Sequence, residues 1–248
     1  DFSPARRRWV ARLAPGPGTE RISARESGVP LALIDGPELT ARRTAAASAL
    51  AARYLAPEGA EKLLMIGTGV LAQHLPMAHA SVRPIKQVRV WGRDSGKAAA
   101  LAQTLTAQGL SATPVGDLAE AVAWADVIST ATLSKTPILQ GAWLRPGQHI
   151  DLVGAFRPDM READDAVLGR ARIFCDTRAG AMKEAGDLCD PLARGAISEG
   201  DIEADLFDLA QGRVTVQRNP DDITLFKSAG TAIEDLAAAM LAYRRVGA

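Results

Sequence analysis

An apolar run that ends in a glycine turn and leads into a helix constrains the fold of this chain most. The run covers residues 63–66, and Gly67, Gly69 and Ala72 follow it. This is the spacing of the dinucleotide-binding fingerprint: a tight turn, a close approach of backbone to pyrophosphate, and a small residue where the helix packs on the strand. The first amides of such a helix favour an anion. The pattern predicts dinucleotide contacts at Gly67, Thr68, Gly69, Val70, Leu71 and Ala72.

Strand-like and helix-like segments alternate along most of the chain. Apolar runs bounded by turn residues predict strands at 29–34, 63–66, 87–91, 111–115, 126–130, 149–154, 172–175 and 223–227. Helical spacing predicts helices at 41–56, 70–80, 95–107, 159–168 and 228–244, with a short helix at the capping-box spacing of Asp117 and Glu120. Such alternation is typical of an α/β fold in which helices cover both faces of a parallel sheet. We therefore expect a Rossmann-type doubly wound sheet.

The two ends of the chain are expected to form a second domain. The helix 41–56 is rich in alanine, which favours close packing, and Thr40 is in position to cap it. Residues 57–59, Pro-Glu-Gly, have the composition of a boundary. The length and position of the helix 228–244 indicate that it packs back on the N-terminal part. The predicted domains are 1–57, 58–227 for nucleotide binding, and the returning helix 228–248.

Two stretches give weaker signals. Residues 15–18, Pro-Gly-Pro-Gly, indicate a loop, and no regular element is predicted before residue 29. Pro76 lies inside the helix 70–80, beyond the first turn, so we expect a kink or an early end there. The chain begins with Asp1 rather than Met, and we expect its N-terminus to be incomplete.

Composition narrows the class of protein. The 248 residues carry 29 basic and 29 acidic side chains, so nucleic acid or an anionic membrane surface is not the expected main partner. Cys175 and Cys189 lack metal-type spacing, which is typical of reduced thiols in a cytoplasmic protein. The three histidines, His74, His79 and His149, do not form a helical metal pair, so no metal is expected. No apolar run reaches the about 20 residues of a membrane helix.

The end of the second nucleotide-domain strand bears on which dinucleotide binds. An Asp or Glu there usually holds the ribose hydroxyls of NAD, whereas this chain has Gly92 followed by Arg93. A guanidinium can pair with a 2′-phosphate, and Lys97 adds a further donor. We therefore expect NADP, with NAD as the alternative if Asp94 holds the ribose instead.

Several blocks of the sequence together resemble the ornithine cyclodeaminase/mu-crystallin family. They extend from about Gly28 to Tyr243 and cover residues 30–48, 67–72, 131–132, 153–161, 184–187 and 226–235. The resemblance implies a homodimer with a Rossmann domain. It also implies a discontinuous domain for substrate binding and dimerisation, built from both ends of the chain. Substrates in the family are small amino or imino acids, and the shared step is hydride transfer between the nicotinamide and a carbon that bears nitrogen.

The resemblance also implies roles for particular residues. Arg43 matches the arginine that lies near the substrate carboxylate, and a guanidinium on an apolar helix is costly to bury unless it holds an anion. A structural ion pair is the other interpretation of Arg43. Ser228 is expected near the nicotinamide, or else as a helix N-cap. The remaining expected cofactor contacts are Thr44, Thr130, Ala131, Thr132 and Val153.

One departure from the family pattern bears on the reaction. Ornithine cyclodeaminases have a catalytic Asp where this chain has Phe156, and no carboxylate follows before Asp159. We therefore expect reduction of a preformed imine, such as 1-pyrroline-2-carboxylate, to the L-amino acid. The alternatives are an NAD-dependent ornithine cyclodeaminase, an alanine dehydrogenase-like enzyme, or a non-catalytic ligand-binding protein. The last is considered because residues 1–27 are too short to supply the pocket lysine and arginine of the family.

Overall fold

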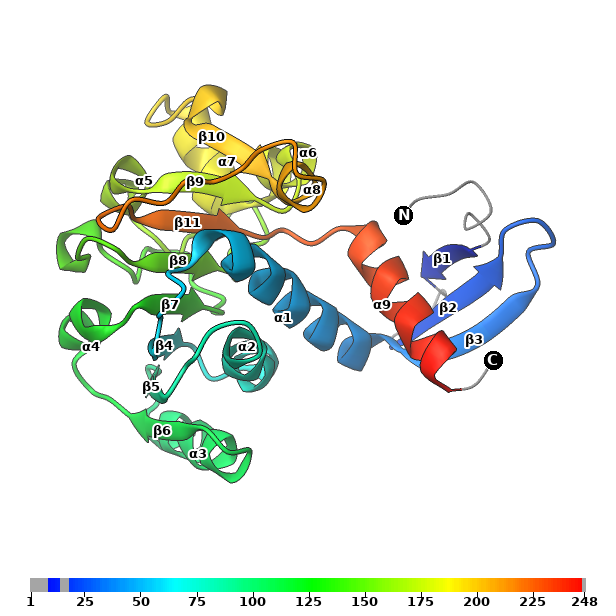
Figure 1. Cartoon of the computed structure of the whole chain (residues 1–248), viewed down its shortest axis with the longest axis horizontal. Helices are drawn as coiled ribbons and strands as arrows, with labels where there is room; N and C mark the ends of the chain where they lie inside the picture. Colours follow the sequence, from blue (N-terminus) through cyan, green and yellow to red (C-terminus); the bar gives the residue numbers. More distant parts are fainter. Residues whose placement is uncertain (1–8, 14–17, 247–248) are drawn as a thin grey trace. The chain divides into compact units, whose positions relative to one another are not determined.

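The computed structural model describes residues 9–13 and 18–246, and the chain forms two compact units (Figure 1). Unit 1 combines residues 1–44 with 231–248, and unit 2 comprises residues 45–230. The division falls inside the first helix, α1 (Gly36–Leu55), whereas the boundary expected from the sequence follows this helix. The expected loop at residues 15–18 lies almost wholly outside the described residues.

Unit 2 is built on a sheet of eight parallel strands, as predicted. Their order is β10-β9-β11-β8-β7-β4-β5-β6. The strands are β4 (Lys62–Ile66), β5 (Gln87–Trp91), β6 (Ser111–Pro114), β7 (Val127–Thr130), β8 (His149–Leu152), β9 (Arg172–Cys175), β10 (Ile202–Asp205) and β11 (Thr224–Lys227). The direction of the strand order reverses between β4 and β7, which is the point where such sheets bind nucleotides.

Helices cover both faces of this sheet (Figure 1). They are α2 (Val70–Ala80), α3 (Ser95–Ala107), α4 (Leu118–Trp124), α5 (Asp165–Arg170), α6 (Arg178–Glu184), α7 (Gly186–Ala193) and α8 (Leu206–Ala210). Side chains alternate along each strand, so Leu63 and Met65 of β4 pack with α1, α2 and α3. Leu64 and Ile66 enter the opposite cluster with α4 to α7. Burial on both faces explains why residues 63–66 of β4 are a continuous apolar run in the sequence.

Short polar side chains set where several helices begin. Asp117 accepts a hydrogen bond from the Glu120 amide at 2.9 Å, so the predicted start of α4 is confirmed. The predicted helix 159–168 is wrong in its start, since α5 begins only at Asp165. The reason is that Asp164 caps α5 by accepting from the Val167 amide at 3.0 Å, while Ala163 is held extended in a bridge to Leu139.

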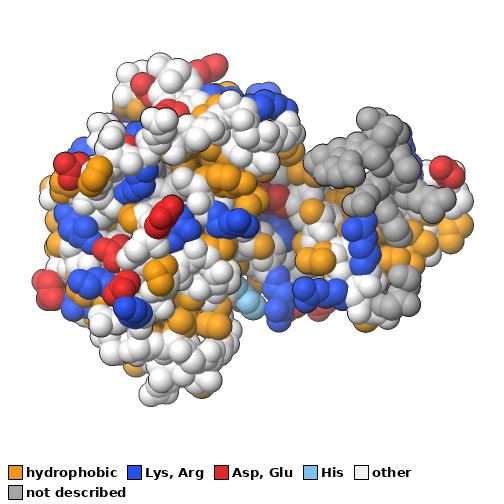
Figure 2. All heavy atoms as spheres, viewed as in Figure 1, with side chains coloured by type: hydrophobic (Ala, Val, Ile, Leu, Met, Phe, Trp, Pro, Cys, Tyr) orange, Lys and Arg blue, Asp and Glu red, His pale blue; other side chains and the backbone are white. Residues whose placement is uncertain are grey.

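Two further expectations in unit 2 are corrected. The early end at Pro76 is wrong, because α2 continues through this residue to Ala80. The strand β10 was not predicted, because its four residues Ile-Glu-Ala-Asp contain only two apolar side chains. Over the face that Figure 2 shows, basic and acidic side chains are interspersed on unit 2, in keeping with the formal net charge of zero.

Unit 1 contains a three-stranded antiparallel sheet and α9 (Ala232–Arg245), together with the first part of α1. The strands are β1 (Trp9–Leu13), β2 (Thr19–Ala24) and β3 (Pro30–Asp35), paired in that order. Ile22, Leu39 and Ala239 form its buried cluster. Neither β1 nor β2 was predicted. For β2 the reason is that its run Thr-Glu-Arg-Ile-Ser-Ala is mostly polar and has little apolar signal.

The expected starts of α1 and α9 are also corrected. Thr40 lies inside α1 rather than at its cap, since the helix begins at Gly36 and Asp35 accepts from the Glu38 amide at 2.8 Å. Ser228 is not the N-cap of α9, which begins after Thr231. Gly230 has a φ of +88°, a left-handed conformation that keeps the chain out of the helix at this point.

Candidate nucleotide-binding and active site

The first glycine of the fingerprint is required by backbone geometry. Gly67 has a φ of +122°, and a Cβ there would lie 2.5 Å from the carbonyl oxygen of Ala131. Its amide donates to the carbonyl of Trp91 at 2.9 Å. The turn after β4 is therefore pressed against the segment that follows β7 and tied to the end of β5, and no L side chain fits.

The second glycine leaves the start of α2 open. Gly69 is the N-cap residue of this helix and supplies no side-chain cap, and a Cβ at this position would meet no atom within 4 Å. Ala72 is fully buried, and its amide donates to the Gly69 carbonyl at 3.1 Å. The first amides of α2 therefore face open space with the positive end of the helix dipole behind them, which fits a pyrophosphate.

The residues after β5 offer a cation for a 2′-phosphate. Gly92 lies against Thr68, where a Cβ would be 2.7 Å from the threonine methyl group. Asp94 caps α3 by accepting from the Lys97 amide at 3.0 Å, so one of its oxygens is engaged by the helix. Arg93 is exposed, and its guanidinium has no hydrogen-bond or ion-pair partner within the part of the chain that the structure describes. The guanidinium is thus available to a ligand.

The carboxyl ends of four neighbouring strands meet at one level of the sheet. Ile66, Thr130, Leu152 and Lys227 pair across β4, β7, β8 and β11. The residues expected to contact the cofactor follow directly: the glycine turn, Thr130 to Thr132, Val153 and Ser228. The fold therefore brings together predicted residues from four separate segments of the sequence.

Glu162 joins these strand ends. The Thr130 hydroxyl donates to one carboxylate oxygen at 2.7 Å, and the amide and hydroxyl of Thr132 donate to the other at 2.6 and 2.8 Å. Glu162 is only 1% exposed. A Cβ at Gly154 would lie 2.4 Å from its Oε1, so this glycine gives the carboxylate room. Glu162 thus fixes the segment after β7 against the segment after β8.

Two further charged side chains complete a buried charge cluster of Glu162, Asp187 and Lys227. The Lys227 ammonium is fully buried and donates to the carbonyls of Leu152, at 3.1 Å, and Gly154. Asp187 accepts from the Glu162 amide at 2.8 Å, and its second oxygen lies 3.5 Å from the Lys227 nitrogen. Burial raises the pKa of Glu162 to about 7, with Lys227 opposing and Asp187 reinforcing the shift.

No pattern in the sequence predicts that these three charged residues form a cluster. Asp187 and Lys227 lie in two of the blocks that resemble the family, and Lys227 also stands out as a charged residue directly after the apolar residues Leu225 and Phe226 of a buried strand. Such a side chain requires a partner. The partners, however, come from segments about which spacing along the chain says nothing.

The segment that leads from β11 toward α9 is held by a buried aspartate. Asp176 is 1% exposed and accepts from the amides of Ala229 and Gly230 at 2.7 and 2.6 Å. The amide of Ser228 donates to the Leu152 carbonyl at 3.2 Å, which continues the strand pairing past β11. Ser228 is therefore anchored at the carboxyl end of the sheet.

The loop after β8 carries the position that departs from the family pattern. Ala155 is the one non-glycine residue with positive φ, 49°, in the described part of the chain. Phe156 next to it is 47% exposed. Asp159 is paired with Lys135 at 3.0 Å and with Arg157 at 3.1 Å, and the Lys135 hydrogen bond in particular lowers its pKa. This loop presents an aromatic ring, and its carboxylate is already paired.

Arg43 of unit 1 forms ion pairs. Its Nε donates to Asp235 at 2.6 Å and its Nη1 to Glu234 at 3.1 Å, and only 14% of the side chain is exposed. Burial and the nearby Asp235 raise the pKa of Glu20, although Arg43 opposes this. Thr44 is 7% exposed. The ion-pair interpretation thus describes Arg43 here, and its contact with a substrate carboxylate stays a prediction.

His79 and His149 lie in the interior of unit 2, whereas His74 is partly exposed. The His79 ring nitrogen Nε2 is 3.0 Å from Asp151, which also accepts from the Ser129 hydroxyl at 2.7 Å. His149 lies 3.0 Å from Thr224, and burial lowers its pKa to about 3. Among the described residues no group of three or more His, Cys, Asp or Glu side chains is arranged to hold a metal ion. No described helix is both long and apolar enough to span a membrane.

The parallel sheet, the glycine turn and the open helix start define a Rossmann-type nucleotide-binding protein. The chain belongs to the ornithine cyclodeaminase/mu-crystallin family, whose model matches residues 19–248.

Relatives within the family include named reductases. The Delta(1)-pyrroline-2-carboxylate reductase of Paracoccus denitrificans is 40% identical over 220 residues, covering 88% of this chain and 70% of that protein. The ketimine reductase mu-crystallin of Mus musculus is 40% identical over 217 residues, covering 88% of this chain and 66% of that protein. These similarities support an NAD(P)-dependent oxidoreductase.

A solved structure shows the same fold. The Delta(1)-pyrroline-2-carboxylate reductase of Thermococcus litoralis, in complex with NADH and L-proline, matches with a TM-score of 0.89 and 34% identity. The match covers 92% of this chain and 71% of that chain. The prediction of a Rossmann-type α/β fold is confirmed.

Proposed function

We propose that this protein reduces a small cyclic imino acid of the 1-pyrroline-2-carboxylate type to the L-amino acid, with NADPH as the reductant. The observation that carries this proposal is the loop after β8. It exposes Phe156 where a deaminase has its base, and its carboxylate, Asp159, is held by Lys135 and Arg157. A loop without a free base suits a substrate that is already an imine.

The chain's own residues have defined tasks in this proposal. The amides at the start of α2 hold the pyrophosphate, while Gly67 and Gly69 give it access. Arg43 exchanges a carboxylate partner for the substrate carboxylate and so orients the C=N carbon. When bound, the nicotinamide supplies the hydride. A cyclic imine that binds as its iminium already carries the proton that its nitrogen keeps, so no strong base is needed.

The buried charge cluster has a positioning task. Glu162 links Thr130 and Thr132 to the backbone beside Gly154, and Lys227 holds the carbonyls of Leu152 and Gly154. These groups form the carboxyl edge, where open α/β sheets bind their ligands. A rigid edge keeps a bound ring in one orientation, which hydride transfer requires.

The preference for NADP rests on Arg93. Its guanidinium is exposed and unpaired among the described residues, whereas one carboxylate oxygen of Asp94 accepts the hydrogen bond that caps α3. NAD remains the alternative, and the reductase of Thermococcus litoralis holds NADH. We further propose that the protein acts as a cytoplasmic homodimer, in which the unit built from both chain ends binds substrate and forms the interface. Light scattering on the purified protein tests the dimer.

Mixing the purified protein with NADPH and 1-pyrroline-2-carboxylate tests the reaction. We expect nicotinamide absorbance to fall while L-proline forms in equal amount. No NADPH consumption with this imine or its six-membered analogue, despite tight cofactor binding, would exclude the proposal. Ammonia release from ornithine that is lost in Asp159→Ala would instead identify a cyclodeaminase. Cofactor binding without turnover on any imine would identify a ligand-binding protein.

A further inference from the structure

The amino edge of the sheet, opposite the candidate active site, contains a basic hollow. Its volume is about 620 Å³, within the range of small-ligand pockets. It is bounded by the end of α1 and by segments that precede β4, β8 and β11. Four arginines line it against two carboxylates; they are Arg53, Arg83, Arg145 and Arg218 against Glu58 and Asp126. We call this hollow the arginine pocket.

Two of these arginines hold the carboxyl end of α1. Arg83 donates to the carbonyls of Ala56 at 2.9 Å and Arg53 at 3.0 Å, and Arg218 donates to the carbonyl of Leu55 at 3.0 Å. The end of a helix carries only about half a negative charge. Arg218 also donates to the carbonyls of Gly147 and Gln148 and to the Thr224 hydroxyl. None of these groups carries a full charge, so two full positive charges stand against the partial charge of the helix end.

The remaining charges do not remove this excess. Arg145 is paired with Asp126, which also accepts from the amides of Glu61 and Lys62 at 3.0 Å. The side chain of Arg53 has no hydrogen-bond or ion-pair partner among the described residues. Burial lowers the pKa of Arg83; the nearby Glu58 carboxylate opposes this shift, and the neighbouring Arg53 adds to it. The pocket thus concentrates positive charge that protein groups only partly neutralise.

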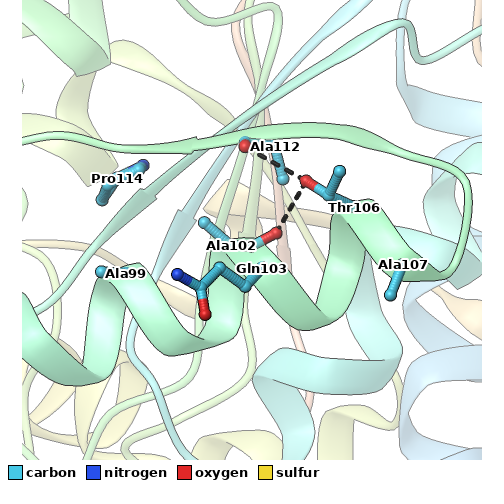
Figure 3. A pocket seen from close by; sticks show the side chains of 7 residues that line it. All are labelled: Ala99, Ala102, Gln103, Thr106, Ala107, Ala112 and Pro114. Atoms are coloured by element: carbon cyan, nitrogen blue, oxygen red, sulfur yellow. Dashed lines mark hydrogen bonds between the residues drawn. The ribbon is translucent and has the colours of Figure 1, made fainter.

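A second hollow, between α3 and β6, differs from the arginine pocket in having no charged side chain in its lining (Figure 3). It measures about 450 Å³ and is lined by Ala99, Ala102, Gln103, Thr106, Ala107, Ala112 and Pro114. The Thr106 hydroxyl is engaged by the carbonyls of Ala102 and Ala112 at 2.9 and 3.3 Å. Without a charged side chain, this hollow offers no specific ligand chemistry.

We infer that the arginine pocket binds a small multivalent anion that bears phosphate or carboxylate groups. Guanidinium groups present planar pairs of N–H donors that match both kinds of oxygen anion. A bound anion relieves the repulsion between Arg53 and Arg83 and supplies hydrogen-bond acceptors to the Arg53 guanidinium, whereas the Arg83 nitrogens already donate to carbonyls. Because the pocket lies at the amino edge, it is separate from the pyrophosphate seat at the start of α2.

Calorimetric titration of the cofactor-saturated protein tests this inference. Saturating NADP+ occupies the seat at α2, so that added inorganic pyrophosphate or citrate reports on the second site at constant ionic strength. We expect the wild type to bind at least one of the two anions. Arg53→Glu, which leaves the α1 caps in place, weakens binding at least about tenfold.

The control is Arg245→Glu, because Arg245 is an exposed arginine in the last turn of α9, as Arg53 is in α1. This variant retains wild-type affinity. Arg53→Gln removes the charge without reversing it and is expected to lose about threefold. Binding of pyrophosphate alone identifies a phosphate ligand, and binding of citrate alone a carboxylate. No heat with either anion, or equal affinities for Arg53→Glu and wild type, overturns the inference.

Discussion

The two edges of the parallel sheet deal with buried charge in different ways. At the carboxyl edge, Glu162 and Lys227 are buried. Glu162 accepts hydrogen bonds from an amide and from hydroxyls, and Lys227 donates to carbonyls in and just after the neighbouring strand β8. At the amino edge, Arg83 and Arg218 are half-buried and bind the end of a helix beside an open hollow. The buried charge cluster thus makes the carboxyl edge rigid, whereas the arginine pocket leaves positive charge available to a ligand.

The largest expected effect is on the free energy of unfolding, which should fall more for a substitution at the carboxyl edge than for one at the amino edge. Lys227→Met removes the cation that is buried between Glu162 and Asp187 and leaves only Arg161, 3.7 Å from Asp187, to balance them, which costs about 3–5 kcal/mol of unfolding free energy. Arg83→Met removes helix-cap bonds that water can partly replace and costs about 1–2 kcal/mol. Denaturant unfolding of both variants measures the difference, with Lys183→Met, an exposed lysine of α6, as the control. Equal losses at Lys227 and Arg83 would remove the distinction.

The second-largest effect is expected on cofactor binding, which should depend on the carboxyl edge and not on the amino edge. Gly67→Val places a side chain against the Ala131 carbonyl at a φ that L residues avoid, so the turn must move. We expect NADPH affinity to fall about a hundredfold, a change of about 2.7 kcal/mol. Anion binding at the amino edge should not change. Gly169→Ala, where the added Cβ meets open space, serves as the control.

A smaller effect is expected at the exposed cation of the carboxyl edge. Arg93→Ser removes the proposed partner of the 2′-phosphate, so the KM for NADPH should rise about tenfold while the KM for NADH changes little. Steady-state kinetics with both cofactors measure this ratio, and Arg213→Ser, at an exposed loop arginine, is the control. A parallel rise for NADH would show that Arg93 does not read the phosphate.

The subtlest difference is in pH dependence. Glu162 has a pKa raised to about 7 from 4.5, so the folded protein keeps its proton while the unfolded chain releases it. The stability of the wild type relative to Glu162→Gln should therefore decline as the pH rises from about 4.5 to about 7. Unfolding curves across this range check the sign, and a constant difference would contradict it.

Sequence patterns predicted the parts of this protein that depend on local geometry. The Gly67 turn, the Asp117 cap and the alternating strands each follow from neighbouring residues. The buried charge cluster could not be predicted, because its members are distant in sequence and meet only when β7, β8 and β11 align. The antiparallel strand β2 was missed for a related reason, since its pairing with β1 and β3 rather than its apolar content defines it.

The last strand of the sheet has a consequence for synthesis. β11 lies between β8 and β9, which do not pair with each other, so Thr224 to Lys227 join strands made earlier. A nascent chain that stops before Thr224 therefore has two partial sheets, each with an open hydrogen-bonding edge. Such edges recruit other strands. Completion of unit 2 must wait until β11 has left the ribosome, and a premature stop just before Thr224 yields an aggregation-prone product.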